Sequence, residues 1–184
     1  EIEKITENLF QFQTQTKIEL LLYAATHKDF EEMFFSLAKK YNLKIGKVTE
    51  KTKVRIIFQP SIVDANEDLI KYGFSWADGF ITKPSGDMAY DAVAAGCFLL
   101  TLSPWGEWEE NIEKIFFNLK IAQKAKADNL SGQVDELISS KWIENAINNV
   151  TVIVQQARMT AQEHAQLADD LRLIREELTK KNLA

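Results

Sequence analysis

Along residues 17–122, short runs of consecutive apolar residues alternate with segments in which apolar residues recur every three or four positions. Short continuous apolar runs predict strands, and apolar residues at a spacing of three or four predict helices between them. The predicted strands are residues 18–25, 54–58, 79–82, 97–102 and 119–122. The predicted helices are a segment after Thr26, with apolar positions from Phe30 to Ala38, and residues 66–76, 87–95, 107–117, 130–139, 140–150 and 151–181.

Strands that alternate with helices indicate parallel strands joined by helical crossovers. The run at residues 97–102 is apolar throughout, which is typical of a parallel strand buried on both faces. The sequence therefore predicts an α/β fold with a Rossmann-like open parallel sheet flanked by helices, followed by a long C-terminal helix.

Residues 17–150 are expected to form this domain, after a linker or N-terminal helix at residues 1–16. Thr26 is the expected N-cap of the first crossover helix, Asn42 and Gly46 its expected end, and Gly96 the C′ glycine of a later helix. Residues 151–184 are expected to be an amphipathic helix packed on the domain. Its apolar positions are Val150, Ile153, Val154, Met159, Leu167, Leu171, Ile174 and Leu178.

The composition narrows the class of protein. A net charge of −5 argues against nucleic acid as the main partner. The single cysteine, Cys97, excludes a disulfide within the chain, and the two histidines, His27 and His164, are far apart in sequence. We expect no bound metal, no cofactor and a cytoplasmic location. No apolar run is long enough to span a bilayer, while peripheral membrane docking of a longer parent chain stays open.

Two strand ends carry candidate binding residues, as expected for open α/β sheets. After residues 79–82, the backbone amides of Ser85, Gly86 and Asp87 would begin a helix, and a helix N-terminus favours phosphate. The alternative is an ordinary strand-to-helix turn with a serine cap.

After residues 97–102, a second turn carries tryptophan rings that could stack on a ligand and polar groups that could bond sugar hydroxyls. Its candidate residues are Trp105, Gly106, Glu107, Trp108 and Asn111.

The alternative reading of the second turn is a charged helix start beside two core tryptophans. Asp91, in the helix after Gly86, is a candidate for binding ribose hydroxyls, although a helical aspartate is more often only solvated. Thr26 and Lys28, after the first strand, are candidate phosphate contacts.

The order and spacing of three segments resemble a known family. Residues 82–86 (Thr-Lys-Pro-Ser-Gly), 91–96 (Asp-Ala-Val-Ala-Ala-Gly) and 104–111 (Pro-Trp-Gly-Glu-Trp-Glu-Glu-Asn) are similar to the C-terminal, donor-binding domain of GT-B glycosyltransferases. The peptidoglycan lipid-intermediate GlcNAc transferase and the diacylglycerol glycosyltransferases are the most similar in style. The resemblance is concentrated in residues 78–116.

The resemblance implies roles for these residues. Ser85 and Gly86 would contact the diphosphate of a nucleotide sugar, and Asp91 would hold the ribose where the family usually has Glu. Glu107 and Trp108 would face the sugar, and Asn111 matches the family Asn. The acceptor and the general base would come from an N-terminal domain outside this chain, so no catalytic residue is assigned here.

The sequence departs from the family in ways that keep two alternatives open. The turn after the first strand, residues 24–28, has no glycine. A non-catalytic module that binds a partner through its terminal helix, and half of a UDP-sugar epimerase, are therefore the competing interpretations. The absence of a G-x-G-x-x-G motif after the first strand argues against a Rossmann dehydrogenase.

Overall fold

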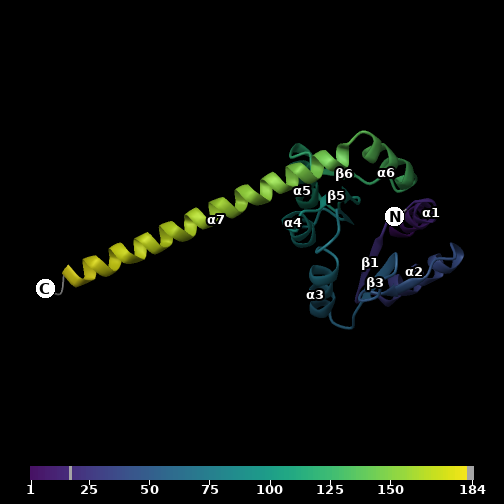
Figure 1. Ribbon diagram of the computed structural model, residues 1–184, viewed down its shortest axis with the longest axis horizontal. Coiled ribbons are helices and arrows are strands. Elements are labelled where there is room, and N and C mark those ends of the chain that lie inside the picture. The colour runs from purple at the N-terminus through teal and green to yellow at the C-terminus, as the bar shows by residue number, and fades with distance from the viewer. Residues whose placement is uncertain (17, 182–184) are drawn as a thin grey trace.

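A computed structural model describes residues 1–16 and 18–181 of the chain, with side chains described as far as Leu173. Strands and helices alternate through the central part (Figure 1). The helices are α1 (Ile2–Gln15), α2 (Lys28–Lys40), α3 (Ile62–Tyr72), α4 (Gly86–Ala94), α5 (Glu107–Asn118), α6 (Leu130–Ser139) and α7 (Trp142–Lys181). The strands are β1 (Leu20–Ala25), β2 (Ile45–Lys47), β3 (Val54–Phe58), β4 (Gly79–Thr82), β5 (Phe98–Thr101) and β6 (Ala122–Lys124).

The strands form two three-stranded parallel sheets, in the orders β1-β3-β2 and β4-β5-β6. Phe80 on β4 pairs with Leu99 on β5, and Leu99 pairs in turn with Ala122 on β6. This arrangement confirms the predicted α/β class with a Rossmann-like parallel architecture, flanking helices and a long C-terminal helix. The strands are divided between two sheets where a single open sheet was expected.

Helix α1 packs across both halves of the fold. Phe10 is fully buried among β1, β3 and α2 residues, whereas Ile5 is buried in a second cluster with Leu100 and Leu130. Lys4 also forms an ion pair with Asp128, at 2.8 Å between Nζ and Oδ1. Residues 2–15 are therefore a helix that joins the two halves.

Four helices end with a residue in the left-handed region, which turns the chain sharply into the next segment. These residues are Asn42, Gly96, Lys120 and Lys141, with φ of 54°, 106°, 58° and 59°. The predicted roles of Asn42 and Gly96 are thus confirmed. The prediction for Gly46 is wrong, because this residue lies in β2, where its backbone passes so close to Thr52 that a Cβ would lie 2.3 Å from the threonine Oγ1.

Two predicted helix starts are also wrong. His27, not Thr26, is the N-cap of α2, because the chain first turns at Ala25 and closes a hydrogen bond from His27 N to Ala24 O. The helix predicted at 66–76 begins earlier, at Ile62, where Ser61 Oγ accepts a hydrogen bond from Asp64 N at 3.5 Å.

The fifth strand, predicted at 119–122, is shifted to Ala122–Lys124, because the chain first turns out of α5 at Lys120.

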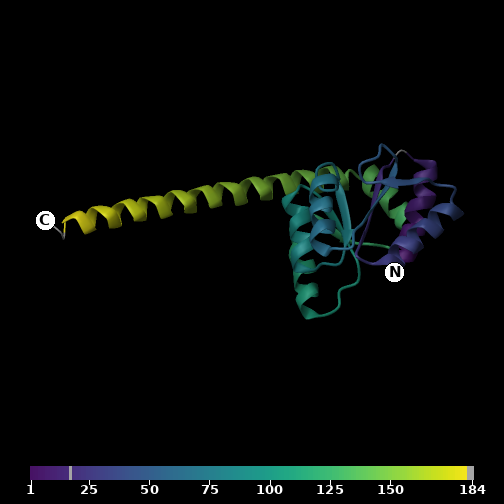
Figure 2. The same cartoon turned by 90° about the horizontal axis from the view of Figure 1, so that it is seen from below.

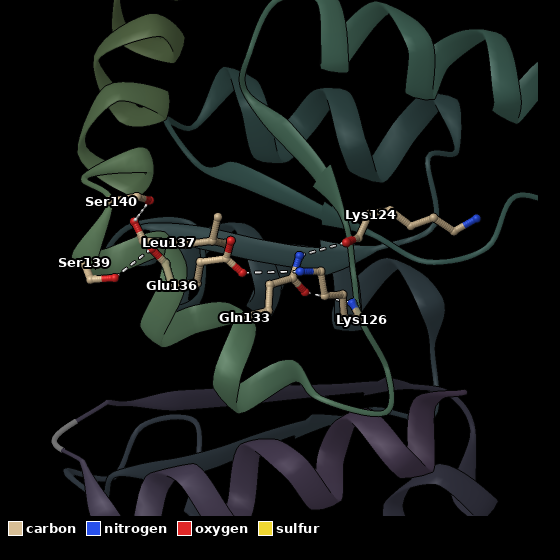
Figure 3. Close-up of polar contacts among 7 residues, drawn as sticks. All are labelled: Lys124, Lys126, Gln133, Glu136, Leu137, Ser139 and Ser140. Carbon is tan, nitrogen blue, oxygen red and sulfur yellow. Dashed lines mark hydrogen bonds and ion pairs between the residues drawn. The ribbon is translucent and has the colours of Figure 1, made fainter.

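The segment that follows β6 is fixed by one buried side chain. Gln133, on α6, donates from Nε2 to the carbonyl of Lys124 at 2.9 Å and accepts the amide of Lys126 at 2.8 Å (Figure 3). One glutamine thus ties α6 to the end of β6.

The principal core joins both sheets and their helices, since it contains Ile57 of β3 together with Leu99, Phe116, Ile121 and Cys97. Cys97 has no exposed surface and its Sγ lies 3.2 Å from the carbonyl oxygen of Ala77, to which it donates. Burial, with a smaller contribution from Asp78, raises the pKa of the Cys97 thiol to about 11, so the thiol is neutral at physiological pH.

Helix α7 is one continuous helix where two were expected, and most of it leaves the domain. Ala146 and Val150 are buried, and Ile153 and Val154 still pack on the principal core. Residues 155–173 are exposed, and the helix projects away from the rest of the fold (Figures 1 and 2). The expected packing of residues 151–184 on the domain is therefore wrong for 155–173, because these residues extend beyond the edge of the domain. The side chains of Ile174 and Leu178 lie outside the described residues.

Within the described residues, we find no helix with the combined length and apolar character that a membrane crossing needs.

Candidate functional site

The carboxyl ends of β4 and β5 lead into two loops that approach each other. The first loop, residues 83–85, runs from β4 into α4, and the second, residues 102–106, runs from β5 into α5. Because β4 and β5 are adjacent and parallel, both loops lie at the same edge of the sheet. This is the edge at which open α/β folds bind ligands.

A cation–π contact joins the two loops. The Nζ atom of Lys83 lies 3.2 Å from the centre of the Trp105 ring. It has essentially no exposed surface and no hydrogen-bond partner. The indole compensates part of the desolvation cost of the ammonium group, but it offers no hydrogen-bond acceptor.

Among the described residues, one other buried side-chain nitrogen lacks a hydrogen-bond partner, the Nε atom of Arg55. The guanidinium of Arg55 nonetheless bonds Glu19, at 3.0 Å from Nη2 to Oε2. No hydrogen bond or ion pair to an acidic group is found for Lys83. Lys83 is therefore a buried ammonium group that faces the Trp105 ring and lacks a hydrogen-bond acceptor.

Two glutamates hold the second loop in place. The amide of Ser103 donates to Glu1 Oε1 at 3.2 Å, and the amide of Trp105 donates to Glu109 Oε2 at 2.7 Å. Just before the loop, Thr101 Oγ1 donates to Glu113 Oε1 at 2.6 Å. The position of the Trp105 backbone is thus fixed from both sides, while the residue as a whole remains 87% exposed.

The N-terminus of α4 is open to solvent. Ser85 is the N-cap, but its side chain makes no capping hydrogen bond. Apart from its chain neighbours and the backbone of its own helix, no heavy atom lies within 4 Å of the position that a Cβ on Gly86 would occupy. The first amides of α4, at Gly86 and Asp87, begin a nine-residue helix beside Lys83 and are free of a side-chain cap. Amide groups in this arrangement can bind phosphate.

The predicted sugar-contacting residues lie in or next to the first turns of α5. Trp105 and Trp108 are 87% and 72% exposed, so the interpretation of both as core residues is wrong: the apolar face of α5 is formed by Ile112 and Phe116. Gly106 is the N-cap of α5, and Glu107 and Asn111 are exposed. The exposed indoles and polar groups are available to a ligand.

Asp91 is separated from these groups. It lines an open pocket of about 380 Å³ with Ala94, Ala95, Ile70, Phe74 and Ser75, near the C-terminal ends of α3 and α4. Neither Ser85 nor the tryptophans line this pocket. Asp91 is five residues beyond Gly86, roughly 7.5 Å along the helix axis.

Thr26 and Lys28 lie at the end of β1, in the other sheet, and both are exposed. Lys28 makes only a long ion pair with Glu32, at 4.0 Å. Ala25 adopts φ of 52°, a left-handed conformation that glycine adopts more easily. The turn thus has the backbone shape associated with glycine, although the sequence has none there.

The residue that sequence reasoning missed is Lys83. It belongs to the Thr-Lys-Pro-Ser-Gly segment, yet no role was assigned to it, because nothing in the sequence shows that its ammonium group is buried. Among the residues whose side chains the structure describes, no group of three or more His, Cys, Asp and Glu residues is placed to hold a metal ion.

Comparisons of the chain with protein-family models, with curated proteins and with solved structures gave no match.

Proposed function

We propose that this chain is the nucleotide-sugar-binding domain of a glycosyltransferase, with UDP-sugar as the donor class. The observation that carries the proposal is the buried ammonium group of Lys83, which lacks a hydrogen-bond acceptor at the edge of the sheet where α4 begins. A buried donor without an acceptor is unfavourable, and a bound anion relieves this cost. The resemblance of residues 78–116 to GT-B donor domains supports the same assignment.

A diphosphate matches this edge of the sheet. One phosphate would accept hydrogen bonds from the amides at the start of α4, where Gly86 leaves room for a close approach. The other would take the ammonium group of Lys83 in place of the Trp105 ring. Backbone amides and one lysine are sufficient for such a ligand, so the acidic net charge of the chain does not oppose binding.

The sugar and the ribose would extend in two directions from the diphosphate. Trp105 and Trp108 offer exposed ring faces for stacking, and Glu107 and Asn111 offer hydrogen-bonding groups for sugar hydroxyls. Asp91 would bind the ribose, since its distance of roughly 7.5 Å along α4 is within the span of a nucleotide. In this scheme the chain binds and orients the donor, and an N-terminal domain supplies the acceptor and the base.

Titration with UDP tests the proposal directly. We expect calorimetry to show binding in the micromolar to low-millimolar range, and Lys83→Gln to weaken it roughly tenfold to a hundredfold. The physical reason is the loss of a charge-assisted hydrogen bond, which is worth about 1.5–3 kcal/mol. Lys114→Gln, which removes an exposed charge from α5, is the matched control and should bind as the wild type does.

Failure of UDP, GDP and dTDP to bind at millimolar concentration would contradict the proposal for this domain. So would UDP binding that is equally strong in Lys83→Gln and the wild type, because the ligand would then occupy a different site.

Inorganic pyrophosphate separates the role of Asp91 from that of Lys83. Because pyrophosphate has no ribose, we expect Asp91→Ala to weaken UDP binding by about tenfold while pyrophosphate binding stays unchanged. Lys83→Gln should weaken both ligands. Competition between pyrophosphate and UDP, followed by tryptophan fluorescence, measures all four cases, and an Asp91→Ala variant with normal UDP affinity would remove Asp91 from the site.

A further inference from the structure

The outer part of α7 is a helix without a packing partner in this chain. We define the outer rod as residues 155–181 of α7. The rod points away from the domain (Figure 1). Its residues with described side chains, 155–173, are all exposed and span roughly 28 Å of helix. A single helix of this length gains little stability in water, because helices in proteins are stabilised mainly by packing one face. A partner packed along one face would therefore stabilise the outer rod.

One stripe of regularly spaced positions, apolar except at Thr160 and His164, runs from the docked part of α7 into the outer rod. Within the domain it consists of Ala146, which is buried, and of Val150 and Ile153, which belong to the principal core or pack against it. These residues are four and three positions apart. From Ile153 onward, the stripe continues through exposed positions at steps of four and three residues in alternation. These are Ala157, Thr160, His164, Leu167 and Leu171, and the sequence keeps the same spacing at Ile174 and Leu178.

This spacing identifies the kind of partner. Steps of three and four residues in alternation, sustained along one stripe, give the 3.5-residue repeat of a left-handed coiled coil. Leu167 and Leu171 are 56% and 58% exposed, and they would be covered by the equivalent side chains of another helix. The partner is therefore a helix with the same repeat.

The charges of the outer rod favour a second copy of this chain. Its sequence contains five Lys and Arg residues and five Asp and Glu residues, so two copies can lie side by side without net repulsion. The same balance disfavours nucleic acid and anionic lipid surfaces, which bind segments rich in basic residues. We propose that two copies of this chain pair through their outer rods as a two-stranded coiled coil.

Sedimentation equilibrium over a wide range of concentration tests this pairing. One chain has a mass of 21.0 kDa, and we expect a species of about twice that mass at micromolar to hundred-micromolar concentration. The double variant Leu167→Lys, Leu171→Lys places two charges in the stripe and should weaken the association by at least a hundredfold. Gln155→Lys, Gln162→Lys adds the same charge on the opposite face of the rod and should leave the mass unchanged.

Circular dichroism gives a second measurement that separates pairing of the rods from contact between the domains. The monomeric leucine variant should lose helical signal, because an unpaired rod frays, while the urea midpoint of domain unfolding should match that of the wild type. A wild-type chain that stays monomeric at hundred-micromolar concentration would overturn the proposal and leave the stripe to a different partner. Dimers that persist unchanged in the leucine variant would also overturn it, because they would use another surface.

Discussion

Replacing Phe116 by alanine is expected to lower the free energy of unfolding by about 3–5 kcal/mol. Phe116 is only 2% exposed, and it is the largest buried side chain of α5 in the principal core. Its ring meets Tyr90 of α4 edge to face, with 5.1 Å between the ring centres. Alanine would remove the apolar contacts and leave a cavity that α4, α5 and the sheet can close only in part.

Urea denaturation followed by tryptophan fluorescence measures this loss, with all variants at one chain concentration because self-association would shift the midpoint. Ile115→Ala is the matched control, since Ile115 is the preceding residue of α5 and is about half exposed. It should change stability by no more than about 0.5 kcal/mol. Equal effects of the two substitutions would show that α5 is not packed on the sheet through Phe116.

Replacing Gln133 by leucine is expected to cost about 2–3 kcal/mol, although the two side chains have similar volumes. Leucine can fill the site but cannot accept the amide of Lys126 or donate to the carbonyl of Lys124. Each group left without a partner in a buried position costs about 1–3 kcal/mol, and the added apolar burial offsets part of this.

The matched control for Gln133 is Ser139→Ala on the same helix. The hydroxyl of Ser139 donates to Glu136 O at 3.1 Å in an exposed position, where water can replace it (Figure 3). Its loss should change the free energy of unfolding by less than about 0.5 kcal/mol. An unchanged urea midpoint for Gln133→Leu would mean that water satisfies the Lys126 amide and the Lys124 carbonyl. The two hydrogen bonds of Gln133 would then not be needed for stability.

The parts of the fold that were predictable from sequence are those whose burial is nearly complete. The run at 97–102 indicated a buried parallel strand, and β5 has Leu99 and Leu100 in the core. By contrast, β2 has only three residues and is a strand because it pairs with β3, which no local pattern reveals. Helix α3 begins with exposed apolar residues, Ile62 and Val63, so the position of its first turn did not follow from the hydrophobic period.

The candidate site was predictable only in outline. The Ser85-Gly86 turn indicated the start of a helix, and α4 does begin at Gly86. The burial of the Lys83 ammonium group depends on Trp105, which follows a different strand and lies 22 residues away. The exposure of Trp108 likewise depends on the orientation in which α5 packs. Both features are results of tertiary packing, which composition and spacing do not encode locally.

The position of α1 has a consequence for how the chain folds. Helix α1 completes its packing only with residues that lie more than a hundred positions later in the sequence, since Lys4 pairs with Asp128 and Ile5 packs with Leu130. Contacts of such high sequence separation slow folding, because a long loop must close before they form. We therefore expect the two halves to reach their native state in one late cooperative step, in which the docking of α1 is among the last events.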